Sequence, residues 1–366
     1  MTRLRSRRFE ASDAARLNDL YNCMVPGRWS LKRRRSLTLM RSLWYQAPGG
    51  PIDSWIVEAE QHDGSWQIVG HHALCPVRFT CGSHDLLCAK TANSILLPEY
   101  RSRFLYLRFE KECLLETGDR FDATYSLAPG TTRLRRALGY EGGGTGVRLV
   151  RGLHSPDALS RLFGHLANRY PLAAWGGVAR ALADVSASEG SGAHLKLCEY
   201  TNAEAMQSTF FSQFWGEARR SAGMSPRRDV ADLAWRFWNR PDSTYATLVY
   251  ESEGGYAYGI VNTTNPCAFH LEDIYVSPAV AGLLDPFLTS VFYWCAGRGA
   301  LLLLFSTTTD GQPAGLLDVF TRRMRPHPLA RIRPANDFPR RFSTAARAKL
   351  EAEASPWNAT MLLAPV

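Results

Sequence analysis

The stretch from Ile68 to Tyr140 limits the possible folds of this 366-residue chain more than any other part of the sequence. It contains, in order, the segments "IVGHHALCPVRFT", "LLCAKTANSILLP", "EYRSR", "FLYLRFEKECLLETG", "FDATYSLA" and "TTRLRRALGY". Their periodicity predicts two apolar strands, a basic turn, an amphipathic helix, a third strand and a short helix. A helix that follows a strand directly leaves backbone N–H groups unpaired at its first turn, where the helix dipole favours negative charge. The stretch therefore predicts an anion-binding site just after Leu97 and Pro98.

The order of these elements and the turn Leu97-Pro98-Glu99-Tyr100-Arg101 resemble those of GNAT acyltransferases. With its closing Leu138-Gly139-Tyr140, the stretch is similar to GNAT proteins associated with bacterial polysaccharide and secondary-metabolite pathways. The resemblance implies that the turn after the fourth strand holds the pyrophosphate of acyl-CoA. It also implies that the thioester lies in a gap between the fourth and fifth strands. The positions that it assigns to donor binding are Ile95, Leu96, Leu97, Arg101, Ser102, Arg103, Phe104 and Leu105.

The sequence departs from the family pattern in this turn, where glycine normally lets the backbone approach the pyrophosphate closely. The first half keeps Arg101 but has Ser102 and Phe104 where related proteins have glycine. In the second half, the matching segment "SPAVAGLLDP" has Ala281 in place of the arginine and adds a negative charge at Asp285. We therefore expect the first half to hold the acyl-CoA, acetyl-CoA or a longer homologue.

The same order of strands, proline turn and helices occurs twice along the chain, and "LAWRFWNRP" at 233–241 resembles a segment in the second half of related GNAT proteins. The sequence thus predicts an α/β (α+β) protein with two GNAT-like domains, each a mixed, mostly antiparallel central sheet flanked by helices. We place an N-terminal domain at 1–150, a helical connector at 151–193 and a C-terminal domain at 194–366. The predicted elements include helices at 28–45, 202–221, 229–239 and 280–296, a last strand of the first unit at 147–150, and a hairpin across Glu253-Gly254-Gly255.

Amide formation from a thioester needs a base for the amine proton and an acid for the leaving thiolate. The acid on the fourth strand and the Tyr on the last helix that GNAT enzymes commonly use are absent from 89–94 and 131–138. The candidate replacements are His72, or its neighbour His71, on the adjacent strand and Tyr125 on the fifth strand. The alternative for each is a packed core residue, which is the more common role of a His or Tyr on such a strand. Asn93 and Ser94 are candidates for orienting the substrate.

In the second half, Glu272 and Asp273 stand where GNAT enzymes often place the base. Alternation along a strand sends only one of these two carboxylates to a given face. One arrangement fits both halves: the first domain holds the donor, and the second contributes acidic groups to an acceptor pocket between the domains. A solvated strand edge is the alternative.

Composition narrows the class of protein. A hydrophobic share of 45% and a charged share of 21% are ordinary for a soluble globular protein. We find no apolar run that approaches the roughly 18 residues needed to span a bilayer. No secretory signal follows the basic N-terminus, so we expect a cytoplasmic protein. The eight cysteines form no C-x-x-C pair and no His stands at metal-like spacing, which favours buried thiols and predicts no metal, although a catalytic Cys stays an alternative.

Three functions fit these patterns. The first is an N-acyltransferase that moves an acyl group from acyl-CoA to an amine of a small biosynthetic intermediate, an amino sugar or a lipid amine. The second is an aminoacyl-tRNA-dependent transferase, because basic patches at the ends of the chain could contact tRNA. The net charge of +9 is concentrated in these patches, which would equally suit the phosphates of CoA or peripheral contact with an anionic membrane. The third is a catalytically inactive GNAT-like binding module. The acceptor, the acyl length and the oligomeric state stay open.

Overall fold

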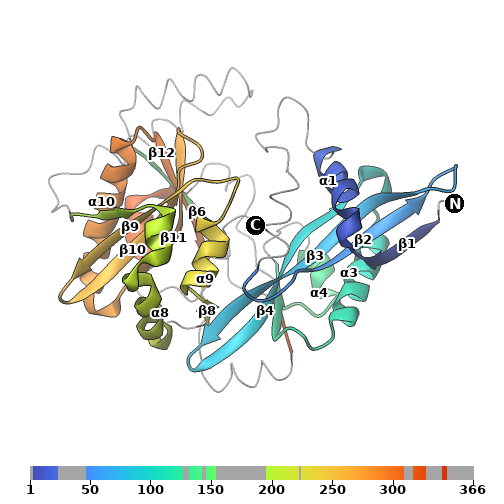
Figure 1. Cartoon of the computed structure of the whole chain (residues 1–366), viewed down its shortest axis with the longest axis horizontal. Coiled ribbons are helices and arrows are strands. Elements are labelled where there is room, and N and C mark those ends of the chain that lie inside the picture. The colour runs from blue at the N-terminus through green and yellow to red at the C-terminus, as the bar shows by residue number, and fades with distance from the viewer. Residues whose placement is uncertain are drawn as a thin grey trace.

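The computed structural model describes residues 3–23, 47–126, 132–141, 146–153, 195–221, 224–308, 316–326 and 340–343. The strands in this part of the chain form two mixed sheets flanked by helices, which confirms the predicted α/β class. In Figure 1 strands β1 to β4 of the first sheet are blue to cyan, and strands β9 to β12 of the second sheet are yellow to orange. The helix predicted at 28–45 and nearly all of the predicted connector lie outside the described residues.

The first sheet has the strand order β1-β2-β3-β4-β5-β14. Neighbouring strands are antiparallel, except for the parallel pair β4 and β5. The hairpin between β2 and β3 turns at Asp63-Gly64, and Gly64 has a φ of 78°, which glycine adopts without strain. The strands are β1 (Leu4–Arg8), β2 (Asp53–Glu60), β3 (Trp66–Cys81), β4 (His84–Leu96), β5 (Ala123–Tyr125) and β14 (Arg340–Phe342).

Helices cover both faces of this sheet. They are η1 (Ala11–Asp13), α1 (Ala14–Cys23), η2 (Pro98–Tyr100), α3 (Arg103–Thr117) and α4 (Thr132–Arg136). Two adjacent residues of β3 show which helix covers which face. His71 bonds to Tyr21 of α1, whereas the ring of His72 packs edge-on against Phe109 of α3. Since successive strand residues point to opposite faces, α1 and α3 lie on opposite sides of the sheet.

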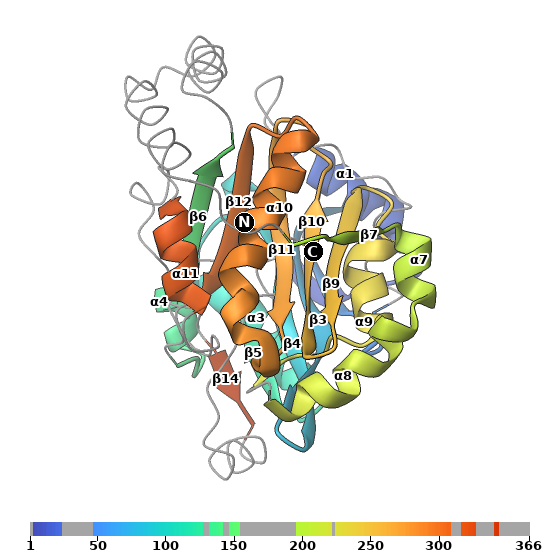
Figure 2. The ribbon, with the colours of Figure 1, turned by 90° about the vertical axis from the view of Figure 1, so that its left-hand side faces the viewer.

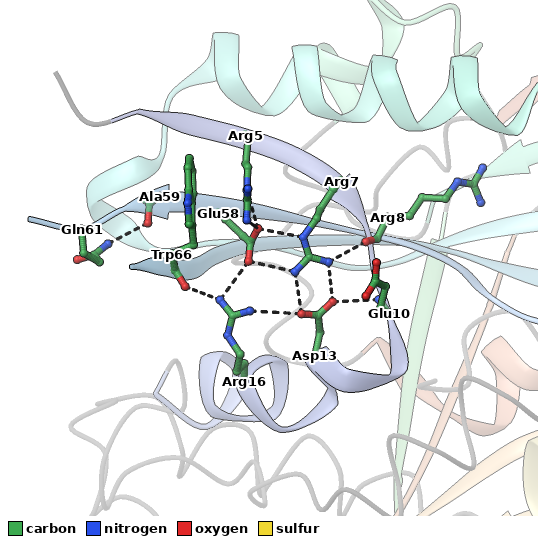
Figure 3. Close-up of polar contacts among 10 residues, drawn as sticks. All are labelled: Arg5, Arg7, Arg8, Glu10, Asp13, Arg16, Glu58, Ala59, Gln61 and Trp66. Atoms are coloured by element: carbon green, nitrogen blue, oxygen red, sulfur yellow. Dashed lines mark hydrogen bonds and ion pairs between the residues drawn. The ribbon is translucent and has the colours of Figure 1, made fainter. Parts of the chain in front are cut away.

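Three arginines surround two buried carboxylates where the edge strand β1 meets α1 (Figure 3). Glu58 accepts hydrogen bonds from Arg5 Nε at 2.9 Å and Arg7 Nε at 3.0 Å. Arg16 Nη2 donates a third, also at 3.0 Å. Asp13 accepts two bonds from Arg7, at 2.7 and 2.8 Å. The hydrogen bonds to Arg7 lower the pKa of Asp13, and although burial opposes it, the arginines also lower the pKa of Glu58. These ion pairs hold the edge strand β1 and the helix α1 together through Glu58 of β2.

The second sheet has the strand order β13-β6-β12-β11-β10-β9-β7. Its one parallel pair is β11 with β12, which matches β4 with β5 in the first sheet. The strands are β6 (Gly146–Gly152), β7 (Cys198–Tyr200), β9 (Tyr245–Ser252), β10 (Gly255–Asn262), β11 (Ala268–Val276), β12 (Leu302–Thr308) and β13 (Arg325–Pro326). The helices are α7 (Asn202–Gln207), α8 (Thr209–Ser221), α9 (Val230–Leu233), the π-helical turn η4 (Ala234–Trp238), η5 (Pro278–Leu283), α10 (Leu284–Gly297) and α11 (Leu316–Arg323).

The single helix predicted at 202–221 is wrong in one respect, because it is two helices broken at Ser208. This residue is extended, with φ −66° and ψ 130°, and its hydroxyl accepts a hydrogen bond from the Phe210 N–H. A serine side chain that caps a helix start competes with continuation of the helix through the same position.

The two halves exchange a strand in each direction. β6 contains the strand predicted at 147–150 to close the first unit, but it pairs with β12 and β13 of the second sheet, where Leu149 joins the core. β14 returns from the far end of the chain to pair with β5, as Figure 2 shows. The outer edge of β5 is thus already occupied, and β6 fills the free edge of β12 instead. The domain boundaries themselves stay predictions, but the strand at 147–150 belongs to the second sheet.

A short strand and a set of ion pairs join the halves. β8 (Ser225–Pro226), from the second half, pairs with the end of β3 at Phe79 and Thr80. Beside it, Arg78 Nη2 contacts Asp229 at 3.0 Å and Asp232 at 2.6 Å.

The search for membrane-spanning runs in the sequence needs one correction. By length and composition alone, the helical stretch Pro278–Gly297 is long and apolar enough to cross a membrane. Phe287, Leu288 and Val291 of this stretch are fully buried in the second core. That burial is typical of the core helix of a globular domain.

Candidate active site

A gap opens in the first sheet where β4 and β5 part. Their parallel pairing covers Cys88, Ala89 and Lys90 on β4, the last of them opposite Tyr125. Beyond Lys90, β4 continues to Leu96 with only β3 as its strand neighbour. The register between β3 and β4 also shifts here, because the four β4 residues from Ala92 to Ile95 lie opposite the three β3 residues from His71 to Ala73. Such a bulge re-aims side chains, and bulges are frequent beside active sites.

Ser94 lies in this bulge and is exposed to solvent. Its Oγ is 2.8 Å from Nδ1 of His72, which is 1% exposed. The second ring nitrogen of His72, Nε2, is buried without a hydrogen-bond partner among the described residues. Burial lowers the pKa of His72 to about 4, so the ring is neutral at pH 7. The pair therefore presents a hydroxyl at the gap that is held by a neutral imidazole.

A buried polar network joins α3 and α4 on the face of the sheet to which His72 points. Arg135 of α4 donates from Nε to Glu110 at 2.8 Å and from Nη2 to the Tyr106 hydroxyl at 3.0 Å, and it also contacts Ser126 Oγ. The Tyr140 hydroxyl donates to Glu110 at 3.3 Å. Burial opposes ionisation of Glu110, but nearby positive charge and hydrogen bonds keep its pKa below the usual value. The network fixes α3 and α4 beneath the gap, and the sequence analysis did not identify it.

The predicted anion-binding turn lies at the open end of the gap. Ser102 is the N-cap of α3, and its Oγ accepts a hydrogen bond from the Leu105 N–H at 3.0 Å. The amides of Arg103 and Phe104 are those that a helix start leaves without an internal acceptor. Arg101 is exposed, and its Nε donates to the Leu96 carbonyl at 3.0 Å, which holds it over the strand end.

The other predicted donor and substrate positions divide into two groups. Ile95 is half-buried, and Leu96 and Leu97 are buried in the first core, so their side chains face the protein and only their backbone is available to a ligand. The side chains of Asn93, Arg103 and Phe104 lie outside what the structure describes. All of these assignments stay predictions.

The second half repeats the gap with different chemistry. Pairing between β11 and β12 ends at Leu271 and Phe305, and the register between β10 and β11 shifts at the next residue, Glu272. The Glu272 side chain is 8% exposed, and Asn262 Nδ2 lies 3.5 Å from its Oε1. Burial raises the pKa of Glu272 to about 7, against the opposing influence of Asn262, Arg240 and Lys90. A carboxylate with that pKa is suited to general base catalysis near neutral pH.

Lys90 connects the two gaps electrostatically. It belongs to the first half, yet its pKa is influenced by Arg236, Arg240 and Glu272 of the second half. Burial lowers the pKa of Lys90 to about 8. The end of the β4–β5 pairing in the first half therefore lies within electrostatic range of Glu272. Lys90 was not identified from the sequence, although a lone lysine within the apolar run 86–97 is itself a signal, because buried lysines are rare.

The remaining predicted catalytic residues, Asp273 and Tyr125, are buried and make contacts within the protein core. Asp273 is fully buried, accepts hydrogen bonds from Arg228 Nε at 3.1 Å and from the Tyr258 hydroxyl at 2.8 Å, and thus lies apart from its neighbour Glu272. Tyr125 is 1% exposed and packs edge-on against Phe79. Burial raises the pKa of Tyr125 well above 10. These surroundings leave neither side chain in contact with the gap's solvent-exposed end.

His71 is also explained by packing, since Tyr21 and Ser54 each lie 2.6 Å from one of its ring nitrogens. Within the described ranges, no group of three or more His, Cys, Asp or Glu side chains is arranged to hold a metal ion.

Comparison with known proteins identifies the fold. No family model and no curated protein matches the sequence. A probable N-acyltransferase from Enterococcus faecalis superposes with a TM-score of 0.60 at 13% identity, over 93% of this chain and 73% of that one. A tandem GNAT protein from the clavulanic acid biosynthesis pathway superposes with a TM-score of 0.56 at 14% identity, over 93% and 98%. Saccharomyces cerevisiae N-myristoyltransferase, solved with bound myristoyl-CoA, gives 0.54 at 10% identity, over 93% and 79%.

Proposed function

Because the chain has the tandem GNAT fold, we propose that it is an N-acyltransferase that moves an acyl group from acyl-CoA to an amine of a small molecule. The observation that carries the proposal is the first-half gap. An exposed hydroxyl, that of Ser94, lies on β4 four residues beyond Lys90, the last β4 residue paired with β5, and the capped start of α3 follows the end of the same strand. One elongated ligand with an anionic end and a reactive carbonyl fits both features.

The donor's phosphates would bind at the start of α3. The amides of Arg103 and Phe104 and the guanidinium of Arg101 supply hydrogen bonds and positive charge to an anion there. The thioester would then lie beside the bulge of β4, where Ser94, held by His72, can hydrogen-bond its carbonyl oxygen. The absent glycines reduce how closely the backbone can approach the phosphates, but the helix start itself is intact.

The reaction forms an amide bond, breaks the thioester C–S bond and removes one proton from the amine, while CoA leaves as a thiolate and takes up one proton. Glu272 is the base that we favour, because its pKa is about 7 and it lies within electrostatic range of Lys90 at the first gap. This assignment gives the second half the acceptor side of the reaction. The acceptor would be an amino sugar, a biosynthetic intermediate or a lipid amine, and the cytoplasm is the expected compartment.

The test combines binding and turnover. Acetyl-CoA, octanoyl-CoA and myristoyl-CoA are each added to the purified protein, the melting temperature is recorded, and free CoA is measured after addition of a panel of amines. We expect a stabilising shift that Arg101→Ala reduces, and amine-dependent release of CoA. No shift with any of the three donors would contradict donor binding. A shift without turnover would support a binding module instead, and activity that requires tRNA and is lost on ribonuclease treatment would support the aminoacyl-tRNA alternative.

A further inference from the structure

The second half contains a cavity that the proposed reaction does not use. It has a volume of about 750 Å³, within the range of sites that hold small molecules. It lies between α8, the β9–β10 hairpin and the turn from β11 into η5. This is the position that corresponds, in the first half, to the predicted phosphate-binding turn.

The hairpin that forms one wall is fixed in place. The Tyr256 N–H donates to Ser277 Oγ at 3.1 Å, and the Ser277 N–H donates to the Tyr256 carbonyl at 2.9 Å. Gly255 has a φ of 150°, and a Cβ there would come within 2.4 Å of Ser277 Oγ. Only glycine therefore lets the hairpin approach the turn this closely, so the cavity is a built feature of the fold.

The charged residues that line the cavity are all acidic. Its lining, all within the described part of the chain, includes Glu251 and Glu253 but no Lys, Arg or His. Both carboxylates are exposed, and no ion pair between described residues involves either of them. A phosphate would be repelled here. The cavity is therefore unsuited to a second CoA, although it lies at a helix start.

The walls are aromatic, and three of their rings, those of Phe210, Tyr256 and Tyr275, are half-buried. Phe210 and Tyr256 meet edge-on with ring centroids 5.2 Å apart, and Tyr256 stacks with Tyr275 at 5.9 Å. Phe214 is buried behind these rings, with its ring centroid 5.8 Å from that of Tyr275. Aromatic faces attract cations through the ring quadrupole, and carboxylates nearby add to that attraction.

We propose that this cavity binds a small organic cation, namely a primary or quaternary ammonium group that carries an apolar body. The ammonium lies near Glu251 and Glu253, and the apolar body lies against the rings of Phe210, Tyr256 and Tyr275. This site is separate from the first-half gap and does not depend on acyl-CoA use.

The experiment measures binding of benzyltrimethylammonium to the full chain by ligand-observed NMR, with benzyl alcohol as the neutral probe of similar shape. We expect the cation to bind and the double variant Glu251→Gln/Glu253→Gln to weaken it about tenfold, which corresponds to about 1.4 kcal/mol. Benzyl alcohol should bind more weakly than the cation, and equally to both proteins. Asp119→Asn removes an exposed carboxylate of the first half and serves as the matched control, with no expected effect on the cation.

Three results would overturn the proposal: equal affinity of the cation for the parent chain and the double variant, equal weakening by Asp119→Asn, or displacement of the cation by acetyl-CoA in direct competition. The exposed Glu→Gln changes leave the core untouched, and circular dichroism of each variant verifies that it is folded. Retained cation binding in the presence of saturating acetyl-CoA would support two separate sites.

Discussion

At the scale of single residues, two consecutive carboxylates have opposite surroundings. Asp273 is held by Arg228 and Tyr258 in a fully buried cluster, whereas Glu272, at the bulge, has a weak contact with Asn262 and a pKa of about 7. Alternation along the strand accounts for the separation, and burial without a strong donor accounts for the raised pKa. The two residues should therefore respond differently to loss of charge.

For Glu272, we expect the carboxylate to be the active form, so that kcat/KM rises with pH through about 7. Glu272→Gln should lower kcat roughly a hundredfold or more, the usual contribution of a general base, and should abolish this pH dependence. Removing a buried charge with a weak partner should leave the melting temperature unchanged or slightly higher. Steady-state kinetics from about pH 5.5 to 9 measure kcat/KM of the parent chain and the variant. An unchanged dependence of kcat/KM on pH in the variant would exclude Glu272 as the general base.

For Asp273, the expected effect is on stability. Asp273→Asn leaves the Arg228 guanidinium buried without its counter-charge, which typically costs about 3 to 5 kcal/mol. Urea unfolding would measure the loss. A variant as stable as the parent chain would show that the ion pair is not structural, and Glu272→Gln serves as the neighbouring control.

The arginine cluster at Glu58 gives a prediction about acid stability. The pKa values of Asp13 and Glu58 are lower in the folded than in the unfolded chain, so their stabilisation is complete above the unfolded values and is lost as the pH falls through the folded ones. We expect stability to decline below about pH 4. Glu58→Gln should cost about 2 kcal/mol, because its arginine partners are partly exposed and can turn to water. The acid-dependent part of the unfolding free energy should shrink in the variant.

At the scale of elements, the start of α3 combines a structural and a binding role that substitution can separate. Ser102→Ala should cost about 1 kcal/mol through loss of the cap. Ser102→Asp keeps a capping oxygen and should retain stability, but its negative charge should weaken CoA binding by electrostatic repulsion. Calorimetric titration with CoA and thermal melting of both variants measure the two effects. Tight CoA binding by Ser102→Asp would argue against phosphate at this turn.

The elements around the gap follow from local sequence, whereas their supporting contacts do not. The strand, proline turn and helix from 84 to 117 are encoded by period, cap and turn residues within about thirty positions, and the structure has them where the sequence predicts them. The Arg135–Glu110 pair joins residues 25 positions apart on two helices, and only the folded chain shows that they meet. The break at Ser208 was also missed, because no Gly or Pro stands there to end a helix.

At the scale of the whole molecule, the exchanged strands make each half depend on the other. β5 and β12 form the far walls of the two gaps, and each is held on its outer side by a strand from the opposite part of the sequence, β14 and β6. Sequence periodicity identified β6 as a strand but could not assign its partner, since a strand's pattern records its faces and not its neighbour.

This arrangement predicts that a chain ending at residue 339, which lacks β14, exposes the edge of β5. We expect a lower melting temperature and a greater tendency to aggregate than in the full chain, because an unpaired edge strand recruits other strands. A chain ending at residue 343 keeps β14 and is the matched control. Equal stability of the two truncated chains would show that β14 contributes little to the first sheet.

The central claim is that the first-half gap holds the acyl donor, and a crystal structure of the protein with acetyl-CoA tests it most directly. We predict the pyrophosphate against the amides of Arg103 and Phe104 and the acetyl group beside Ser94, with the second-half cavity free of CoA. Density for CoA at the turn into η5, or a crystal grown at saturating acetyl-CoA with the first-half gap closed by protein side chains, would contradict the claim.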